Sequence, residues 1–191
     1  MTSADLLQVF RNCGAVLEGH FQLSSGKHSD TYFEKFQVLQ FPEQVELLCR
    51  NIADRFRDKN IEVVCGPTTG GILIAYEVAR QLGVRAVYAE REDGKRVLRR
   101  GFDIERGERV LVVDDVLTTG LSVFEVLDML KDYHANVMGV GIFVDRSGGN
   151  VELGVPTESL LSMVVQAWTP EECPQCKAGE PITERGSRRL K

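Results

Sequence analysis

The stretch that decides the fold is Val110-Leu111-Val112-Val113-Asp114-Asp115-Val116-Leu117-Thr118-Thr119-Gly120-Leu121-Ser122. Its first four residues are apolar, which predicts a fully buried strand. Two acidic residues stand at the end of this strand, a short loop rich in hydroxyl groups follows, and a helix is expected from Gly120 to about Tyr133. The stretch therefore predicts a strand–loop–helix unit whose polar groups gather where the strand ends.

The loop of this unit is suited to an anion. Backbone N–H groups at a helix start carry partial positive charge. Thr118, Thr119 and Ser122 add hydroxyl donors, and Gly120 lets the backbone approach a ligand closely. We expect a phosphate here, with the two preceding acids placed for sugar hydroxyls or a metal. The alternative is a plain helix cap with solvated acids, while a nucleotide P-loop is excluded because Gly-x-x-x-x-Gly-Lys-Ser/Thr is absent.

Apolar strands alternate with amphipathic helices on both sides of this unit. Further strands are expected at 32–33, 61–65, 86–89, 137–144 and 160–167. Helices are expected at 3–16, 42–56 and 72–82, the last closed by Gly83. This alternation predicts an α/β fold with a mostly parallel sheet covered by helices on both faces. Such sheets bind ligands at the carboxyl ends of their strands.

Composition excludes several classes of protein. The chain has 191 residues, a net charge of −5 and 43% hydrophobic residues, which is ordinary for a globular domain and not for a disordered or fibrous protein. No apolar run approaches the ~20 residues of a membrane span, and no signal peptide is evident. The acidic charge argues against a nucleic-acid partner. Five cysteines without a secretory signal indicate a cytoplasmic protein.

Residues 110–122 closely resemble the phosphoribosyl-pyrophosphate (PRPP) signature of type I phosphoribosyltransferases. The resemblance implies one domain over 1–191, with a core at about 43–168 and a hood made of about 1–40 plus the C-terminal segment. It implies that the two acids meet the ribose and that the loop wraps the 5′-phosphate. The residues that it assigns to PRPP are Arg91, Lys95, Asp114, Asp115, Val116, Leu117, Thr118, Thr119, Gly120, Leu121, Ser122, Thr69 and Gly70.

Residues 19–33 and 145–149 resemble the orotate-binding parts of orotate phosphoribosyltransferases. In that family a Ser-Gly-x-x-Ser loop and an aromatic pair frame the pyrimidine, which implies Ser25, Gly26, Tyr32 and Phe33, with Thr118 nearby. An arginine after a strand meets the orotate carboxylate, which implies Arg146, and a planar guanidinium suits a carboxylate. By itself, the segment 19–33 is equally consistent with a surface turn before core aromatics. For the segment 145–149 the usual alternative is a surface ion pair.

The segment 91–101 carries five basic and two acidic residues and predicts a mobile hairpin between strands. It resembles the family's catalytic flexible loop, which closes over pyrophosphate in the neighbouring subunit of a dimer. Lys95 and Arg91 align with its catalytic basic residues, and Arg99 and Arg100 align less well. With Asp115 they are the expected catalytic residues. A solvated charged hairpin is the alternative.

The loop after the early strand departs from the family's pattern, whereas residues 172–179 resemble a C-terminal extension in one subgroup of these enzymes. Many relatives have a lysine where this chain has Gly70, so backbone N–H groups would contact the pyrophosphate. The tail contains Cys173-Pro-Gln-Cys176, but one Cys-x-x-Cys supplies two ligands where structural zinc needs four. The three histidines have no ligand spacing relative to it, so the sequence favours a local turn that packs the tail onto the body.

The resemblance implies transfer of phosphoribose from PRPP to orotate, giving orotidine 5′-monophosphate and pyrophosphate in pyrimidine biosynthesis. Mg²⁺ would be the cofactor, held mainly by PRPP rather than by protein ligands. The protein would be a cytoplasmic homodimer with shared active sites, without a nucleic-acid or membrane partner. The alternatives are a transferase for another base and a non-catalytic regulator that senses PRPP, although no DNA-binding element is evident.

Overall fold

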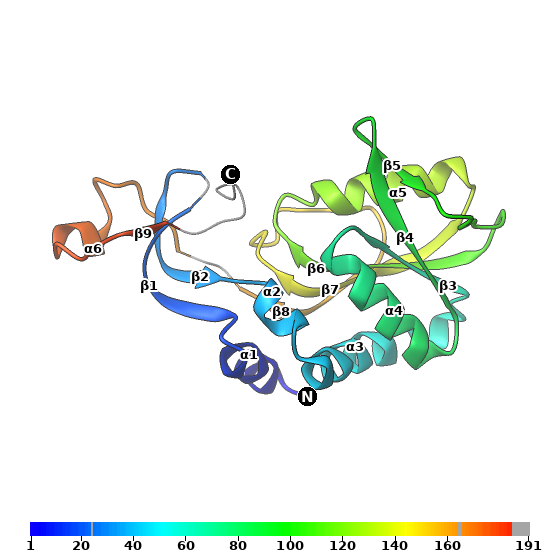
Figure 1. The fold of residues 1–191 in the computed structure, drawn as a ribbon, viewed down its shortest axis with the longest axis horizontal. Coiled ribbons are helices and arrows are strands. Elements are labelled where there is room, and N and C mark those ends of the chain that lie inside the picture. Colours follow the sequence, from blue (N-terminus) through cyan, green and yellow to red (C-terminus); the bar gives the residue numbers. More distant parts are fainter. Residues whose placement is uncertain (24, 164–165, 185–191) are drawn as a thin grey trace.

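The structure is a computed structural model that describes residues 1–23, 25–163 and 166–184. Figure 1 shows a larger body built around a sheet and a smaller hood to one side of it. None of the helices in the described ranges combines the length and apolar character needed to cross a bilayer.

The body contains a six-stranded sheet in the order β5-β4-β3-β6-β7-β8. Its strands are β3 (Val63–Pro67), β4 (Arg85–Glu92), β5 (Lys95–Leu98), β6 (Arg109–Leu117), β7 (Asn136–Asp145) and β8 (Thr157–Ser162). Every neighbouring pair is parallel except β4 and β5, which form an antiparallel hairpin. The expected α/β fold with a mostly parallel sheet is confirmed.

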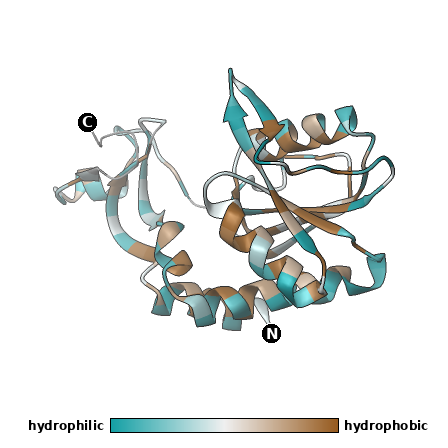
Figure 2. Cartoon of the chain, turned by 45° about the vertical axis from the view of Figure 1, so that its right-hand side comes forward, coloured by the Kyte–Doolittle hydropathy of each residue, from teal (hydrophilic) through white to brown (hydrophobic). Residues whose placement is uncertain are grey.

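Helices cover both faces of this sheet because β6 is apolar on both sides. Leu111 and Val113 join a core with α3 (Pro42–Phe56) and α4 (Gly70–Leu82), whereas Val110 and Val112 join a second core with α5 (Leu121–Asp132). Alternate strand residues face opposite sides, so one run of apolar residues serves both cores. Figure 2 shows this apolar character in the central strands and polar residues at the tip of the β4–β5 hairpin.

Both ends of the chain build the hood. After α1 (Ser3–Asn12), β1 (Val16–Gln22) and β2 (His28–Phe33) form a hairpin, and α2 (Phe36–Leu39) leads into the body. The chain returns through α6 (Pro174–Lys177), and β9 (Thr183–Glu184) adds to β1 as a parallel strand. The hood sheet therefore has the order β2-β1-β9.

The expected element ends need two corrections. The first helix ends at Asn12 rather than near Val16, because Gly14 adopts a φ of 67° and the chain then extends into β1. The last strand of the body, β8, covers Thr157–Ser162 rather than 160–167. Val164 and Val165 of that expectation lie outside the described residues. The expected helix cap at Gly83 is confirmed by its φ of 73°.

Candidate active site

Several of the predicted site residues lie where β3, β6 and β7 end. These strands are parallel neighbours with β6 in the middle, so the loops after them leave the same edge of the sheet. The loop after β3 carries Thr69 and Gly70, β6 ends in the acids and the phosphate loop, and Arg146 directly follows β7. Arg146 is also tied to β6, because its N–H donates to the carbonyl of Leu117 at 2.8 Å.

The two acids are buried at the floor of the site. Asp114 is 7% exposed and Asp115 is 3% exposed. Burial, followed by the neighbouring charge of Asp115, raises the pKa of Asp114 to about 7, against the opposing effects of the Asp115 N–H, Lys35 and Arg96. The Oδ2 atom of Asp115 is buried without a hydrogen-bond partner in the described part of the chain. This pair therefore offers unsatisfied acceptors to a ligand with hydroxyl groups or to a cation.

Lys35 balances part of this charge, although the sequence did not identify it as a site residue. Its Nζ atom lies 3.1 Å from Oδ1 of Asp115, and its ammonium stands 5.2 Å above the ring of Phe36. The only signal in the sequence was one lysine among aromatic residues just after the hood strand. Its partner is 80 residues away, so the pairing depends on the tertiary structure.

The loop that the sequence predicts to bind phosphate lies between β6 and α5. Gly120 adopts a φ of 76° and begins α5, and the exposed Thr118 and Thr119 precede it. Leu121 is exposed and Ser122 half-buried, so backbone N–H groups and hydroxyls remain accessible. Leu117 is different, since its side chain is 2% exposed in the second core and only its backbone is left for a ligand. The half-buried Val116 precedes it in β6.

The loop after β3 packs directly against the acids. A methyl group added at Gly70 would overlap Oδ2 of Asp115, and one at Gly66 would overlap the backbone of Gly71. Thr69 precedes the first turn of α4, whose N–H groups point towards the same edge. Because Gly70 has no side chain, the loop after β3 can approach the acids at the end of β6. This close approach is a structural reason for glycine at the position where many relatives have lysine.

The hood brings one of its two expected aromatic residues to the site. Burial lowers the pKa of Arg146, and the Tyr32 phenol acts on it in the opposite direction, so Tyr32 lies close to this guanidinium. The Nε atom of Arg146 is buried and has no hydrogen-bond partner among the described residues. Phe33, by contrast, is 5% exposed and packs edge-on against Phe10 in the core, 5.3 Å between ring centroids. Strand alternation turns its side chain away from the opening, which leaves only its backbone for orotate.

Ser25 and Gly26 lie in the exposed turn between β1 and β2. Gly26 adopts a φ of 81° and its N–H donates to the carbonyl of Leu23 at 2.9 Å. No hydrogen bond in the described ranges joins this turn to the strand ends of the body. Their contact with orotate remains a prediction.

The segment 91–101 forms a hairpin, as expected, that stands out from the body (Figure 1). Lys95 is exposed beside the tip, and within the described residues it has no ion pair. Arg91 pairs with Glu125 of α5. Within the described residues, neither Lys95 nor Arg91 forms a hydrogen bond or an ion pair with the aspartate pair of the same chain.

The sequence missed the role of Arg96 in this hairpin. Its side chain is buried, with Nη1 donating to Thr68 Oγ1 at 2.9 Å and Nε to Glu125 Oε2 at 3.2 Å. Glu125 thus holds two arginines and anchors the base of the hairpin on α5. Nothing in the local pattern distinguishes Arg96 from its basic neighbours, because its partners come from other elements.

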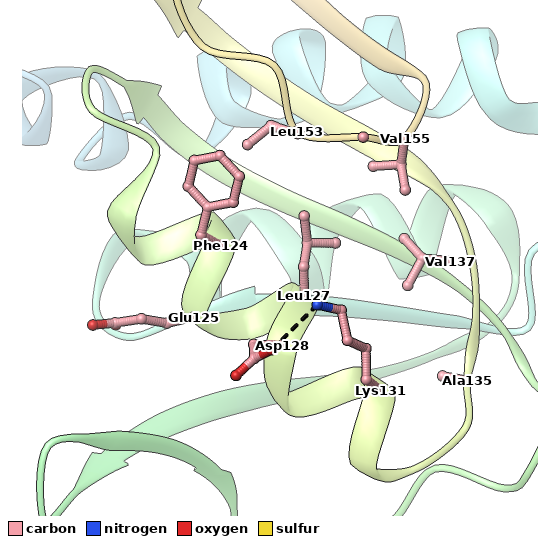
Figure 3. A pocket seen from close by; sticks show the side chains of 10 residues that line it. Phe124, Glu125, Leu127, Asp128, Lys131, Ala135, Val137, Leu153 and Val155 are labelled. Carbon is pink, nitrogen blue, oxygen red and sulfur yellow. Dashed lines mark hydrogen bonds and ion pairs between the residues drawn. The ribbon is translucent and has the colours of Figure 1, made fainter.

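A groove of about 710 Å³ lies between α5 and the loop before β8 (Figure 3). Its lining is mainly apolar, with Phe124, Leu127, Leu153 and Val155 turned into it, while the carboxylate of Glu125 points away. None of the predicted site residues lines it. This groove is therefore separate from the site residues that the sequence predicted at the strand ends.

Comparison with known proteins agrees with this geometry. Residues 37–171 match the model of the phosphoribosyl transferase domain. The orotate phosphoribosyltransferase of Pelotomaculum thermopropionicum is 53% identical over 190 residues, covering 100% of both chains. That of Caldicellulosiruptor bescii is 51% identical and covers 96% of both.

Solved structures show the same relationship. The orotate phosphoribosyltransferase of Aeropyrum pernix superposes with a TM-score of 0.68 at 29% identity, covering 83% of this chain and 93% of that one. The Mycobacterium tuberculosis enzyme superposes with a TM-score of 0.70 at 26% identity, covering 84% and 96%. With its paired acids, phosphate loop and strand-end arginine, the chain belongs to the phosphoribosyltransferase family and, within it, to the orotate phosphoribosyltransferases.

Proposed function

We propose that this chain transfers the 5-phosphoribosyl group of PRPP to N1 of orotate, releasing pyrophosphate and forming orotidine 5′-monophosphate for pyrimidine nucleotide synthesis. The observation that carries the proposal is the buried acid pair at the end of β6, placed between a phosphate loop and an arginine with an unpartnered Nε atom. The family relationship supports the reaction.

PRPP would bind across the ends of β3 and β6. Asp114 and Asp115 accept hydrogen bonds from the ribose hydroxyls, for which Oδ2 of Asp115 is available. The loop from Thr118 to Ser122 binds the 5′-phosphate through hydroxyls and backbone N–H groups. The N–H groups at Thr69 and Gly70 lie on the pyrophosphate side.

Orotate would bind between β7 and the hood. The guanidinium of Arg146 offers a planar pair of donors to the orotate carboxylate. A hydrogen bond from Arg146 to bound orotate would offset the free-energy cost of burying the Nε atom without a partner. Tyr32 lies beside it and limits the space for the pyrimidine. Thr118 supplies a nearby hydroxyl, and Ser25 and Gly26 belong to the turn that would close over the ring.

Lys95 and Arg91 would stabilise the pyrophosphate as it leaves and positive charge develops on the ribose. Among the described residues neither side chain forms an ion pair with the acids of its own chain. In a homodimer the hairpin would serve the partner's site. Closure of such a loop excludes water from PRPP. We place the reaction in the cytoplasm.

The residues present fit a magnesium ion bound together with PRPP. Asp115 offers a buried carboxylate oxygen without a partner, and Mg²⁺ prefers such oxygen ligands beside phosphate oxygens and waters. When bound, the ion would neutralise phosphate charge and orient the pyrophosphate. Asp114 and Asp115 would form the protein side of that arrangement, and the ribose hydroxyls would belong to the bound PRPP.

The test is the loss of orotate absorbance when the protein is mixed with PRPP and Mg²⁺, with a second reaction containing chelator as control. Parallel reactions with adenine, hypoxanthine, guanine and uracil identify the accepted base. Turnover of another base in place of orotate would indicate the other-base transferase. Binding of PRPP without turnover of any base would indicate a regulator.

A further inference from the structure

Two histidines and two cysteines converge in the hood, far from the proposed reaction. His20 and His28 come from β1 and β2, and Cys173 and Cys176 from the tail around α6. His28 pairs with Gln22 across the hairpin, and His20 lies two residues before Gln22 on the same face of β1. The two imidazoles are therefore neighbours, with ring centroids 5.0 Å apart.

The four ligand atoms surround a single point. His20 Nε2 lies 3.1 Å from His28 Nδ1 and 3.5 Å from each cysteine sulfur, and His28 Nδ1 lies 3.1 Å from Cys176 Sγ. All four atoms lie within 4.8 Å of one another. A tetrahedral zinc ion with two nitrogen and two sulfur ligands requires separations of roughly 3.3–3.8 Å between its ligands. The observed spacing is close to that of a zinc site.

The surroundings orient His20 as a ligand. Its Nδ1 atom lies 2.9 Å from the carbonyl oxygen of Glu180, which can only accept a hydrogen bond. Nδ1 must therefore carry the proton, and Nε2 directs a lone pair into the cluster. A backbone carbonyl behind a ligating histidine is the usual outer contact of a zinc site.

Apart from this cluster, the described part of the tail has few buried side chains to hold it in place. In residues 169–183, for which the structure describes burial, Cys173 is the one buried residue, and neither hydrophobic core includes any of them. The tail is joined to the hairpin by backbone pairing of β9 with β1 and by Gln175 Nε2 donating to the carbonyl of Gly19 at 3.0 Å. Small units without an apolar core commonly depend on a metal for stability.

We propose that His20, His28, Cys173 and Cys176 bind one zinc ion, which fastens the C-terminal tail to the β1–β2 hairpin. Two thiols and two imidazole nitrogens favour zinc over magnesium, which prefers oxygen ligands. Binding as two thiolates and two neutral imidazoles releases two protons and leaves the site uncharged. With four protein ligands the ion has no open position, so its role is structural.

The sequence favoured a local turn here because the tail by itself supplies only two ligands, Cys173 and Cys176. The other two lie about 150 residues earlier in the chain and reach the tail only through the folded hood. The site also bears on the reaction, since His28 belongs to the strand that carries Tyr32. Zinc would thus hold the strand that presents Tyr32 to Arg146.

The test is the metal content of the full-length chain, purified under reducing conditions without a histidine tag. We expect about one zinc per chain by mass spectrometry of the metal in the wild type, and almost none in Cys173→Ser and Cys176→Ser. Cys13→Ser and His134→Gln are the matched controls and should keep the zinc. Co²⁺ in place of zinc should give the visible bands of a tetrahedral thiolate site, lost in the same two variants.

A second measurement needs no substitution. Removal of the metal by a chelator should increase hydrogen exchange in residues 169–184 and leave α4 unchanged, because the body has its own cores. The proposal is overturned if the wild type takes up no zinc from ZnCl₂, if the two serine variants keep it, or if a Cys173–Cys176 disulfide is found instead.

Discussion

The buried acid pair predicts that replacing Asp114 by asparagine stabilises the ligand-free protein at neutral and alkaline pH. Burial is the main reason that the pKa of Asp114 rises from 3.8 to about 7. Asparagine has the same shape and keeps an Oδ1 atom that can accept the Asp115 N–H, a contact of 2.8 Å in the structure. The variant therefore removes the charge and retains the hydrogen bond.

The pKa shift sets the size of this effect. At about 1.4 kcal/mol per pKa unit, a shift from 3.8 to about 7 corresponds to at most about 4 kcal/mol. The folded protein holds the proton to higher pH than the unfolded chain does. The wild-type free energy of unfolding is therefore highest, as far as this group is concerned, below pH 3.8. It falls as the pH rises to about 7 and is then constant.

Urea unfolding of both proteins at several pH values measures the difference. We expect Asp114→Asn to be more stable by up to about 4 kcal/mol at about pH 8 and by about 1.5 kcal/mol at about pH 5. Asp128→Asn is the control, since that side chain is 81% exposed on α5 and should give no such trend. A variant that is no more stable at pH 8, or a difference that does not change with pH, would refute the reasoning.

The remaining predictions concern the loops and the arginine. Lys95→Ala should lower turnover by about 10²-fold, as loss of one charge-stabilising donor does, and leave urea unfolding nearly unchanged because the residue is exposed. Lys131→Ala, also exposed, is its control, and near-normal turnover in Lys95→Ala would contradict the catalytic role. Arg146→Ala should raise the orotate KM by about 10- to 100-fold, the value of a hydrogen bond to a charged group, and change the PRPP KM little; equal effects would exclude orotate binding. Gly70→Ala should lower the free energy of unfolding, measured with urea, by about 1–3 kcal/mol, because the added methyl group overlaps Asp115. The same overlap should weaken PRPP binding. Unchanged stability in this variant would show that the two loops are not in close contact.

The local pattern of the sequence was sufficient for most of the body. Runs such as 110–113 determine a strand with two buried faces, and the glycine at 120 determines where the following helix begins. The acids, the phosphate loop and Arg146 follow such strands directly, so the parallel order of the sheet brings them to one edge. These features depend on contiguous residues, and a single sequence displays them.

The tertiary structure decided which distant side chains meet. Lys35 pairs with Asp115 and Arg96 with Glu125 only because their elements are packed together. Strand register turned Tyr32 towards Arg146 and Phe33 into the core. The cluster of two histidines and two cysteines exists because the tail returns to the first hairpin after about 150 residues. No local pattern encodes such contacts, since they depend on how segments far apart in the chain pack against one another.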